Sequence, residues 1–368
     1  MRFKLVKQEI YPILQNAINF TSTKNTNTIL QNIYISAENN KITFKTNSII
    51  SGFCATIDAH VEFEGVTTVI CKKLLDIIKE IPDSTVIDFF FDGSRMKITA
   101  GKASFSLATM SPELFPAMTD IAPEYSLKLN TTDFISIVDK TLFCVANTAA
   151  KIEFTGLHLK VYGNKLEVHS SDFQRIASAT ININDEQSDE FIINIPKKSV
   201  SDIYKAVLDN SEIEIFTDLK QLMVVSGNIK IFSRLIEKTV KSISSLFHDD
   251  TPIQLVVNKN MLLENIRKVM AIASEITHAV VFSVTGDTLT LYSLETEYGQ
   301  GIDKLENIDH KGDDIDIVLN ARLLQEILNH IDSNDVIFKI IGRRNPVLIY
   351  PTVGNYKYLL VPLAIDRA

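Results

Sequence analysis

Two short segments carry side chains of the types that perform chemistry. The segment His169–Asp172 (HSSD) holds a histidine, serines and a carboxylate, which are the components of a hydrolase triad. No Gly-x-Ser-x-Gly sequence accompanies it, and one short segment cannot place three triad members within reach of one another. Asp313, Asp314 and Asp316 could hold Mg²⁺ through their carboxylates, but a solvated acidic loop explains the same residues more simply. Neither segment predicts catalysis.

Patterns that bind phosphates, metals or other thiols are also weak. Gly299–Gly301 (GQG) resembles the start of a dinucleotide fingerprint, but the third glycine and the strand-turn-helix context are missing. The seven histidines are dispersed and show no H-x-x-x-H spacing. Cys54, Cys71 and Cys144 lie far apart, so we expect small buried side chains in a reducing compartment rather than disulfides. The sequence therefore predicts no catalytic residue, no metal and no cofactor.

The composition is that of a globular protein with more than one domain. Hydrophobic residues make up 45% and charged residues 22% of the 368 residues, which excludes extensive disorder. No run approaches the roughly 18 apolar residues that a membrane span requires. The segment Met1–Lys7 has neither the apolar core nor the cleavage site of a secretory signal. We therefore expect a cytoplasmic protein without a membrane partner.

The elements that must position any site recur three times along the chain. Each copy opens with a helical segment and contains a second one further on. The spacing of Leu262, Ile266 and Met270 is typical of the buried stripe of such a helix, and Thr131 and Asn258 are predicted N-caps. The six predicted helices are Lys7–Phe20, Lys72–Ile81, Thr131–Asn147, Lys197–Leu208, Asn258–Ser274 and Ala321–Ile331.

A hairpin follows the first helix of each copy, and a meander of strands follows the second. The hairpin turns are predicted at 38–40, 162–164 and 286–287, where Asn, Asp or Gly separates alternating β-formers. This order predicts an α+β fold in three copies, each with two helices packed on an antiparallel sheet. The boundaries are expected near Pro123 and the polar run 248–252. The three predicted domains are residues 1–122, 123–250 and 251–368.

The predicted helices are more basic than the rest of the chain. They carry 12 Lys or Arg and 8 Asp or Glu, a net charge of +4, whereas the whole chain carries −8. The remainder therefore carries −12. If the polar faces of all six helices line one surface, that surface would attract phosphates without reading bases, and the acidic exterior would repel a duplex elsewhere. Scattered, solvated lysines are the alternative explanation.

Four groups of short motifs follow one another along the chain. They are Thr28–Asn32, Phe105–Leu107 with Glu113–Pro116, Ser171–Ala177 (SDxxRIA) and Tyr358–Leu363. In these motifs the chain resembles the bacterial DNA polymerase III beta subunit family, the sliding clamps. The resemblance extends over essentially all 368 residues, and the order and spacing of its motifs make it specific.

The resemblance implies three tandem clamp domains and a closed ring that acts in DNA replication. Two copies would join head to tail as a homodimer, with helices lining a hole for duplex DNA and with sheets forming the outer wall. The ring would slide without sequence preference and hold the DNA polymerase III alpha subunit on its template. A clamp loader and other proteins with a clamp-binding motif would be further partners. The ring would confer processivity and have no catalytic activity of its own.

The resemblance also assigns three groups of residues. Contacts with DNA are expected at Lys24, Lys72, Thr148, Ala149, Lys151, Ile152 and Glu153. A hydrophobic pocket for partner peptides is expected to be lined by Phe154, Ser171, Phe173, Arg175, Ile176, Leu246, Leu359, Leu360, Val361, Pro362 and Leu363. The dimer interface is expected to place Phe105 and Leu107 of one copy against Ile272 and Ala273 of the next.

Within this pocket the apolar side chains would supply burial, each contributing about 1.5–3 kcal/mol if fully covered. Arg175 would hydrogen-bond a carbonyl or a glutamine of the peptide. Leu360→Asp is accordingly expected to abolish peptide binding and to leave the ring intact.

The chain departs from the family pattern at four places. Ile152 and Glu153 stand where family members often carry aromatic or basic residues. Residues 240–245 (VKSISS) replace a Phe-Pro-Asp-Tyr stretch followed by basic residues, and the chain continues through 364–368. Ala273 is small for a dimer contact. We therefore expect an altered DNA contact, a changed peptide preference and a weaker dimer.

Two other classes of function are compatible with parts of this pattern. A polymerase-associated nuclease would need clustered carboxylates for two metals, and the sequence offers no suitable cluster. A purely proteinaceous interaction scaffold would share the repeats but hold no DNA. Retention on circular but not on linear DNA would distinguish a clamp from such a scaffold.

Overall fold

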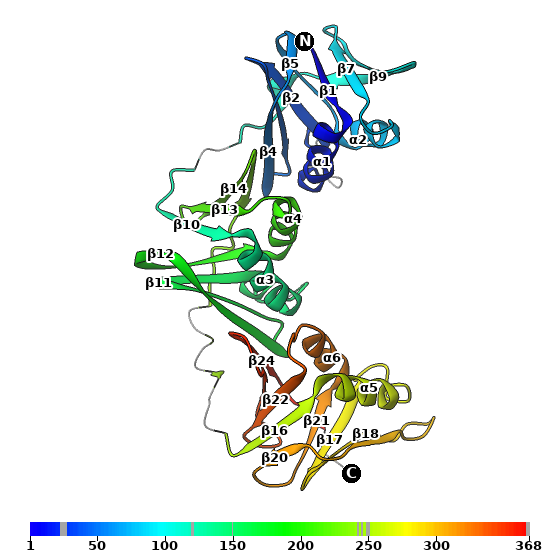
Figure 1. The fold of residues 1–368 in the computed structure, drawn as a ribbon, viewed down its shortest axis with the longest axis vertical. Coiled ribbons are helices and arrows are strands. Elements are labelled where there is room, and N and C mark those ends of the chain that lie inside the picture. The colour runs from blue at the N-terminus through cyan, green and yellow to red at the C-terminus, as the bar shows by residue number, and fades with distance from the viewer. Residues whose placement is uncertain are drawn as a thin grey trace. The chain divides into compact units, whose positions relative to one another are not determined.

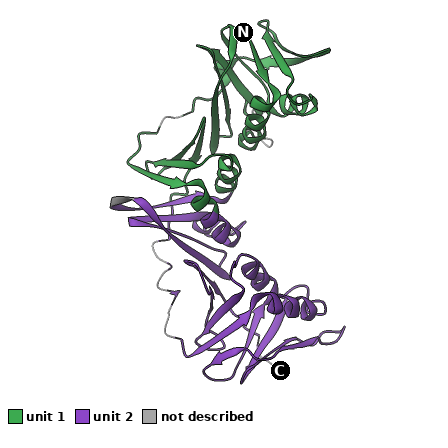
Figure 2. Ribbon diagram, in the orientation of Figure 1, with its two compact units in different colours: residues 1–135, 198–237 green, residues 136–197, 238–368 purple. Residues whose placement is uncertain are grey.

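A computed structural model of the chain describes residues 1–22, 28–118, 121–148, 150–240, 243, 246–247 and 251–365, with the backbone alone at 185–188. Contacts group the chain into two compact units, which Figure 2 distinguishes by colour. Unit 1 comprises Met1–Ile135 and Lys198–Glu237, and unit 2 comprises Ser136–Lys197 and Lys238–Ala368. Residues of the predicted central domain, 123–250, are therefore divided between the two units.

Unit 1 combines an N-terminal α+β repeat with part of the central one (Figure 1). The elements of the N-terminal repeat are β1 (Arg2–Val6), α1 (Lys7–Ala17), β2 (Asn32–Glu38), β3 (Lys41–Asn47), β4 (Ser51–Asp58), β5 (His60–Phe63), β6 (Gly65–Ile70), α2 (Cys71–Glu80), β7 (Val86–Phe91), β8 (Arg95–Ala100) and β9 (Ala103–Met110). The elements from the central repeat are β10 (Tyr125–Asn130), α4 (Lys197–Val207), β13 (Glu212–Thr217), β14 (Gln221–Ser226) and β15 (Ile229–Arg234). The residues of α3 (Thr131–Thr141) are shared between the units.

Unit 2 combines the rest of the central repeat with the C-terminal repeat. Its central elements are two long strands, β11 (Gly156–Ser171) and β12 (Arg175–Pro196). The C-terminal elements are β16 (Ile253–Asn258), α5 (Lys259–Met270), β17 (Ala279–Thr285), β18 (Thr288–Ser293), β19 (Ile302–Leu305), β20 (Asp309–Lys311), β21 (Ile315–Asn320), α6 (Ala321–Asn329), β22 (Asp335–Ile340), β23 (Val347–Pro351) and β24 (Tyr356–Leu360).

Each unit contains a sheet that continues from one repeat into the next. In unit 1, β15 pairs antiparallel with β4, so that Ile231 lies opposite Phe53 within a sheet of thirteen strands. In unit 2, β24 pairs antiparallel with β12, so that Leu359 lies opposite Ile176 within a sheet of seven strands. The third meander strand of one repeat thus pairs with a strand of the preceding repeat at both junctions. Strands β19, β18, β17 and β21 form a separate sheet.

Two of the three predicted hairpins are confirmed. Glu38 pairs with Lys41 across Asn39 and Asn40, whose φ angles of 52° and 56° match a two-residue type I′ turn. In the C-terminal repeat, Thr285 pairs with Thr288 across the predicted turn at 286–287.

The remaining predicted hairpin, with separate strands on either side of 162–164, is wrong. The structure has one continuous strand, β11, through these positions. Gly163 has a φ of 52°, and the register with β12 shifts on both sides of it. The turn signal therefore appears as an irregularity inside a long strand pair, because pairing with β12 continues on both sides of the glycine.

All six predicted helices are present, with ends that differ by a few residues. The Asn258 side chain caps α5 and accepts a hydrogen bond from the Met261 backbone N–H at 3.2 Å, as predicted. Thr131 is not an N-cap, because it is the first residue of α3 and its side chain is buried. Within the described ranges, none of the helices has the length and apolar character to cross a membrane.

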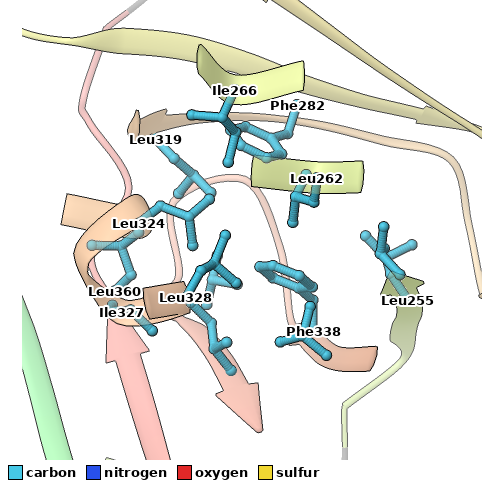
Figure 3. Close-up of a cluster of buried hydrophobic side chains, with 14 of the residues drawn as sticks. Leu255, Leu262, Ile266, Phe282, Leu319, Leu324, Ile327, Leu328, Phe338 and Leu360 are labelled. Atoms are coloured by element: carbon cyan, nitrogen blue, oxygen red, sulfur yellow. The ribbon is translucent and has the colours of Figure 1, made fainter. Parts of the chain in front are cut away.

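The core of unit 2 is formed where α5 and α6 meet the strands. Leu262 and Ile266 of α5 and Leu324 and Leu328 of α6 are fully buried, consistent with the four-residue spacing of the predicted stripe. Figure 3 shows these side chains converging with others from the surrounding strands, including Phe338. This packing holds α6 in place beside the site described below.

The three cysteines are free thiols and are largely buried. Cys71 and Cys144 have no exposed surface, as predicted, whereas Cys54 is partly exposed. Burial raises the pKa of the Cys71 thiol to about 12. This thiol is therefore protonated and unreactive near neutral pH.

Candidate functional site

An apolar cluster in unit 2 lies where the sequence predicts a peptide pocket. Ile176 of β12 and Leu359 of β24 are opposite each other across the strand pair, and both are buried in this cluster. The members that the sequence analysis did not name are Ile243, Phe247 and Leu348, with Val240 and Tyr350 packed against them. Together these side chains form an apolar floor contributed by three separate stretches of the chain.

One signal in the sequence could have indicated two of the unnamed members. Ile243 and Phe247 stand four positions apart in the segment that links two repeats, a spacing that can place both side chains on one face. Leu348 pairs with Leu359 across β23 and β24 and so shares a face with a residue that was named, but only the sheet register shows this pairing.

Large apolar side chains lie exposed beside this floor. Phe173 is 50% exposed, Leu246 is 49% exposed and Val361 is 39% exposed. The ring of Phe154 lies 4.3 Å from that of Phe173 between centroids. We call this floor and its exposed rim the candidate pocket. An apolar side chain of a partner would cover surface here that the chain itself leaves in water.

The rim is held by a tight turn between β11 and β12. The Ser171 hydroxyl accepts a hydrogen bond from the Phe173 N–H at 3.1 Å and donates one to the Arg175 carbonyl at 3.0 Å. Phe173 has a φ of 71°, an uncommon conformation for a bulky residue. The Val361 N–H donates to the Gln174 carbonyl at 2.8 Å and ties the C-terminal segment to this turn.

Arg175 is occupied by groups of the protein itself. Its side chain is only 7% exposed, and its Nε donates to Asp172 Oδ2 at 2.9 Å. Its Nη1 lies 2.7 Å from Glu326 Oε2 as an ion pair, and its Nη2 donates to the Phe143 carbonyl at 3.3 Å. The guanidinium therefore stabilises the turn and its contact with α6. Its N–H groups are buried, so they are not exposed to donate the expected hydrogen bond to a peptide.

Leu360 does not line the candidate pocket, contrary to the sequence-based expectation. Side chains alternate along β24, so Leu359 faces the apolar floor while Tyr358 and Leu360 face the core formed by α5, α6 and their strands. Leu360 is fully buried there, and Figure 3 places it beside the residues of α6.

Beyond β24 the chain turns toward another strand. Pro362 and Leu363 are partly buried, and the Leu363 N–H donates to the Val318 carbonyl of β21 at 2.9 Å. Residues 361–363 are therefore fixed at both ends, which positions Val361 at the rim.

Two stacked histidines support the neighbouring backbone. The rings of His158 and His169 lie 5.1 Å apart at an angle of 8°. His158 Nε2 donates to the Glu153 carbonyl at 2.8 Å, and its Nδ1 accepts from the Val240 N–H at 3.4 Å, which requires a neutral ring. Burial lowers the pKa of His158, and it lowers the pKa of His169 to about 3. Both rings are therefore neutral near pH 7.

Most of the described residues that are expected to contact DNA are exposed. Lys72 is 64% exposed on α2 and pairs with Asp76 at 2.7 Å. Thr148 and Lys151 are exposed, and Ile152 and Glu153 begin a short 3₁₀ helix. Ile152 is 56% exposed, whereas the Glu153 side chain is partly buried. Lys24 and Ala149 lie outside the described residues.

The residues expected at the dimer interface lie on strand edges or next to them. Phe105 and Leu107 are partly exposed on β9, which pairs with β8 at Ala103–Ala108 and with β6 only at Thr109 and Met110. Ile272 and Ala273 follow α5 and are partly buried.

The edge strand beside Ile272 is β19. In the described part of the chain β19 pairs with β18 alone, and a Cβ atom on Gly301 would lie 2.9 Å from Ile272 Cγ2. Ile272 therefore covers the backbone that leads into this edge.

The segments with potentially chemical side chains form no reactive arrangement. His169 and Ser170 are buried, and the Ser170 hydroxyl donates to the Thr141 carbonyl. Asp314 accepts a hydrogen bond from the Gly286 N–H at 2.9 Å and so stabilises a turn. Over the described ranges, no three His, Cys, Asp or Glu side chains are grouped to hold a metal ion.

Three family models match the chain in succession. The N-terminal domain of the DNA polymerase III beta subunit matches residues 1–119, its central domain matches 128–241, and its C-terminal domain matches 244–363. Three domains of one family therefore follow one another along the chain.

Whole-chain comparisons agree with this assignment. A beta sliding clamp of Rickettsia bellii is 26% identical over 96% of this chain and 97% of its own length. One of Staphylococcus epidermidis is 24% identical over 95% of this chain and 96% of its own length.

Solved structures of similar proteins share the fold over nearly the whole chain. A sliding clamp of Pseudomonas aeruginosa superimposes with a TM-score of 0.95 at 17% identity, covering 99% of this chain and all of that one. A putative beta subunit of Eubacterium rectale gives 0.93 at 23% identity with the same coverage. With all three family domains matched in order, the chain belongs to the DNA polymerase III beta subunit family.

Proposed function

We propose that this protein is a sliding clamp that confers processivity on DNA polymerase III. Two copies close head to tail into a ring around duplex DNA, and the ring slides without reading sequence. The chain has no catalytic role of its own and acts by topology, because a closed ring leaves DNA only by opening. Weak phosphate contacts suit this role, since strong ones would slow sliding.

One observation carries the closed assembly, namely the repeated pairing between domains. The third meander strand pairs with the preceding repeat at β15–β4 and again at β24–β12. In the N-terminal repeat the third meander strand is β9, and in the C-terminal repeat the strand equivalent to β4 is β19. The same pairing would join β9 to β19, and the described part of the chain contains no such pair. A second copy supplies it, and both free edges are then covered.

The repeats also define the register of this proposed pair. Lys230 is the second residue after the β14–β15 turn and lies opposite Cys54. Ser104 is likewise the second residue after the β8–β9 turn, so it is equivalent to Lys230. Ile302 of β19 is equivalent to Cys54 of β4, because Ile302 pairs with Tyr292 as Cys54 pairs with Lys45. Ser104 of one copy therefore lies opposite Ile302 of the other. This register places Phe105 opposite Gly301, beside Ile272.

Cysteine cross-linking tests this register. The double variant Ser104→Cys, Ile302→Cys in a Cys54→Ser background should form covalent dimers under mild oxidation. The matched control, Ser106→Cys with Ile302→Cys, shifts the thiol by two residues and should cross-link much more slowly. Equal cross-linking of both pairs, or none in either, would contradict the proposed junction.

The DNA-encircling role is tested by topology. Protein loaded by its clamp loader and ATP onto nicked circular DNA should remain bound during gel filtration, and linearising the DNA should release it. Equal retention on both forms would indicate ordinary DNA binding, and no retention on either would favour an interaction scaffold.

The candidate pocket is the proposed docking site for the polymerase alpha subunit, the clamp loader and other partners. Its support is the buried floor with exposed Phe173, Leu246 and Val361 beside it. Phe173→Gly should relieve the unusual backbone angle while removing rim surface. We expect it to weaken binding of a peptide from the C-terminus of the polymerase alpha chain about tenfold, for a loss of ~1.4 kcal/mol, without lowering the melting temperature. Unchanged affinity would argue against this pocket.

The DNA-contacting residues assigned by resemblance belong to this proposal as well. Lys72 and Lys151 are exposed and can approach phosphates, whereas Ile152 adds an apolar surface and Glu153 an unfavourable charge. Cytoplasmic location and the domain limits at 122 and 250 remain predictions from the sequence.

A further inference from the structure

A turn in unit 1 repeats the backbone arrangement of the candidate-pocket rim. In unit 2 the Asp172 N–H donates to the Arg175 carbonyl at 3.3 Å, and in unit 1 the Ser48 N–H donates to the Ser51 carbonyl at 2.8 Å. The second residue of each turn has a positive φ, 71° at Phe173 and 77° at Ile49. A β-branched residue in this conformation is a marked outlier.

The strands that follow the two turns are joined in the same way. The Arg234 N–H donates to the Ile50 carbonyl at 2.8 Å, as the Val361 N–H does to the Gln174 carbonyl. Phe232 lies opposite Gly52 in the β15–β4 pair, where Leu359 lies opposite Ile176 in the β24–β12 pair. Gly52 and Phe232 are therefore the positional equivalents of the two floor residues Ile176 and Leu359.

In both units, residues of a linker between repeats pack beside the turn and its neighbouring strand. In the candidate pocket, Ile243 and Phe247 of one linker pack on the floor. In unit 1, residues 116–118 of the preceding linker lie against the turn and β15. A Cβ atom on Gly52 would come within 2.9 Å of Met118 Cε, so the flexible Met118 side chain occupies the space above this glycine.

A cavity remains beside Met118, and we call it the β4–β15 groove. Its volume is about 170 Å³, and its lining includes Ile49, Ile50, Phe232, Met118 and Arg234. This volume suits one large side chain rather than a drug-sized ligand. Ile49 is 51% exposed and Ile50 is 58% exposed, so apolar surface continues outward from the cavity.

The charge of the residues that line the groove indicates which kind of ligand fits it. Arg234 is exposed and is the charged residue among the described residues that line the groove. An arginine at the edge of an apolar cavity pairs well with a carboxylate next to an apolar anchor. Together with the turn geometry shared with the candidate pocket, this favours an extended acidic peptide over a neutral small molecule.

We propose that the β4–β15 groove is a second peptide-docking site, which binds an extended segment with a leucine or phenylalanine anchor beside an acidic residue. The anchor enters next to Met118, and the carboxylate pairs with Arg234. This inference rests on the proposed function in one respect, since the candidate pocket is its template.

The Met118 methyl group provides a direct readout of the groove. The full-length protein is labelled with [methyl-¹³C]methionine, and Met118→Leu assigns its resonance among the seven methionines. The probe is the acetylated and amidated peptide Gly-Ser-Asp-Leu-Phe-Gly. We expect saturable movement of the Met118 signal, with affinity reduced at least tenfold by Arg234→Glu. Lys220→Glu makes the same charge change on a neighbouring exposed position and should have little effect.

A second variant separates this proposal from the candidate pocket. Leu246→Asp alters only the rim of the candidate pocket and should leave the Met118 response intact. If Leu246→Asp removes the Met118 response, or if no response occurs at millimolar peptide, the β4–β15 groove is not a docking site. If the response persists while calorimetry detects no other site, the candidate pocket fails and the groove stands. If Arg234→Glu instead lowers a concentration-dependent mass in sedimentation, the occupant is a second copy and the peptide proposal is overturned.

Discussion

Arg175 on β12 and Glu326 on α6 form an ion pair of 2.7 Å that joins the central and C-terminal repeats within unit 2. The arginine side chain is 7% exposed, whereas the glutamate is 41% exposed. Because the cation is the buried partner, losing its carboxylate leaves a desolvated charge, while Asp172 compensates only in part.

We therefore expect Glu326→Gln to lower the free energy of unfolding by about 1–3 kcal/mol. Thermal melting should show the loss as a lower midpoint for the transition that includes unit 2. Glu264→Gln, on the exposed face of α5, is the matched control and should change stability by less than about 0.5 kcal/mol. Equal effects of the two substitutions would show that the ion pair contributes nothing specific.

Leu360→Asp should prevent folding of the C-terminal repeat, rather than abolish peptide binding alone. The substitution places a carboxylate in a core where Leu360 is fully buried. Leu246→Asp, at a position 49% exposed, should retain the native circular dichroism spectrum and lose affinity for the same polymerase peptide. A folded Leu360→Asp protein with an unchanged melting temperature would contradict the orientation of β24.

Acidification should destabilise unit 2 through its stacked histidines. The folded-state pKa of His169 is about 3, below the unfolded value near 6.5. The unfolded chain therefore binds the extra proton between these values, and stability falls as the pH drops below about 6.5. For this histidine alone the loss between pH 7 and pH 5 is about 2 kcal/mol.

His169→Phe removes the titrating group and keeps an aromatic ring against His158. Neither nitrogen of His169 makes a well-aligned hydrogen bond in the described structure, so the replacement abandons no such bond. We expect a smaller drop in melting temperature between pH 7 and pH 5 than in the unmodified protein. His310→Phe, at a partly exposed site, is the control, and a pH dependence identical in all three proteins would refute the assignment.

Lys72→Ala should weaken sequence-independent binding to duplex DNA and reduce its salt dependence. Removing one phosphate contact lowers the slope of log affinity against log salt by about 0.9. Fluorescence anisotropy of a labelled duplex at several salt concentrations measures this slope. Lys165→Ala, at an exposed position on β11, should leave the slope unchanged, and a matching decrease there would show only a general charge effect.

The sequence by itself determined the repeats, the six helices and the family. Helical stripes such as Leu262, Ile266 and Met270 and turns such as Asn39–Asn40 are local patterns, because each depends on residues close in the chain. Order and spacing of short motifs then sufficed to identify the family, although no single motif was decisive.

Tertiary structure alone decided which residues meet across long separations. The pairing of Phe53 with Ile231 joins residues from different repeats, and no local periodicity encodes that partner. Sequence motifs could not tell that Leu360 faces the core, because alternation places neighbours on opposite faces and only the sheet register decides which face is buried. The ion pair of Arg175 with Glu326 has the same cause, since it joins segments far apart in the chain.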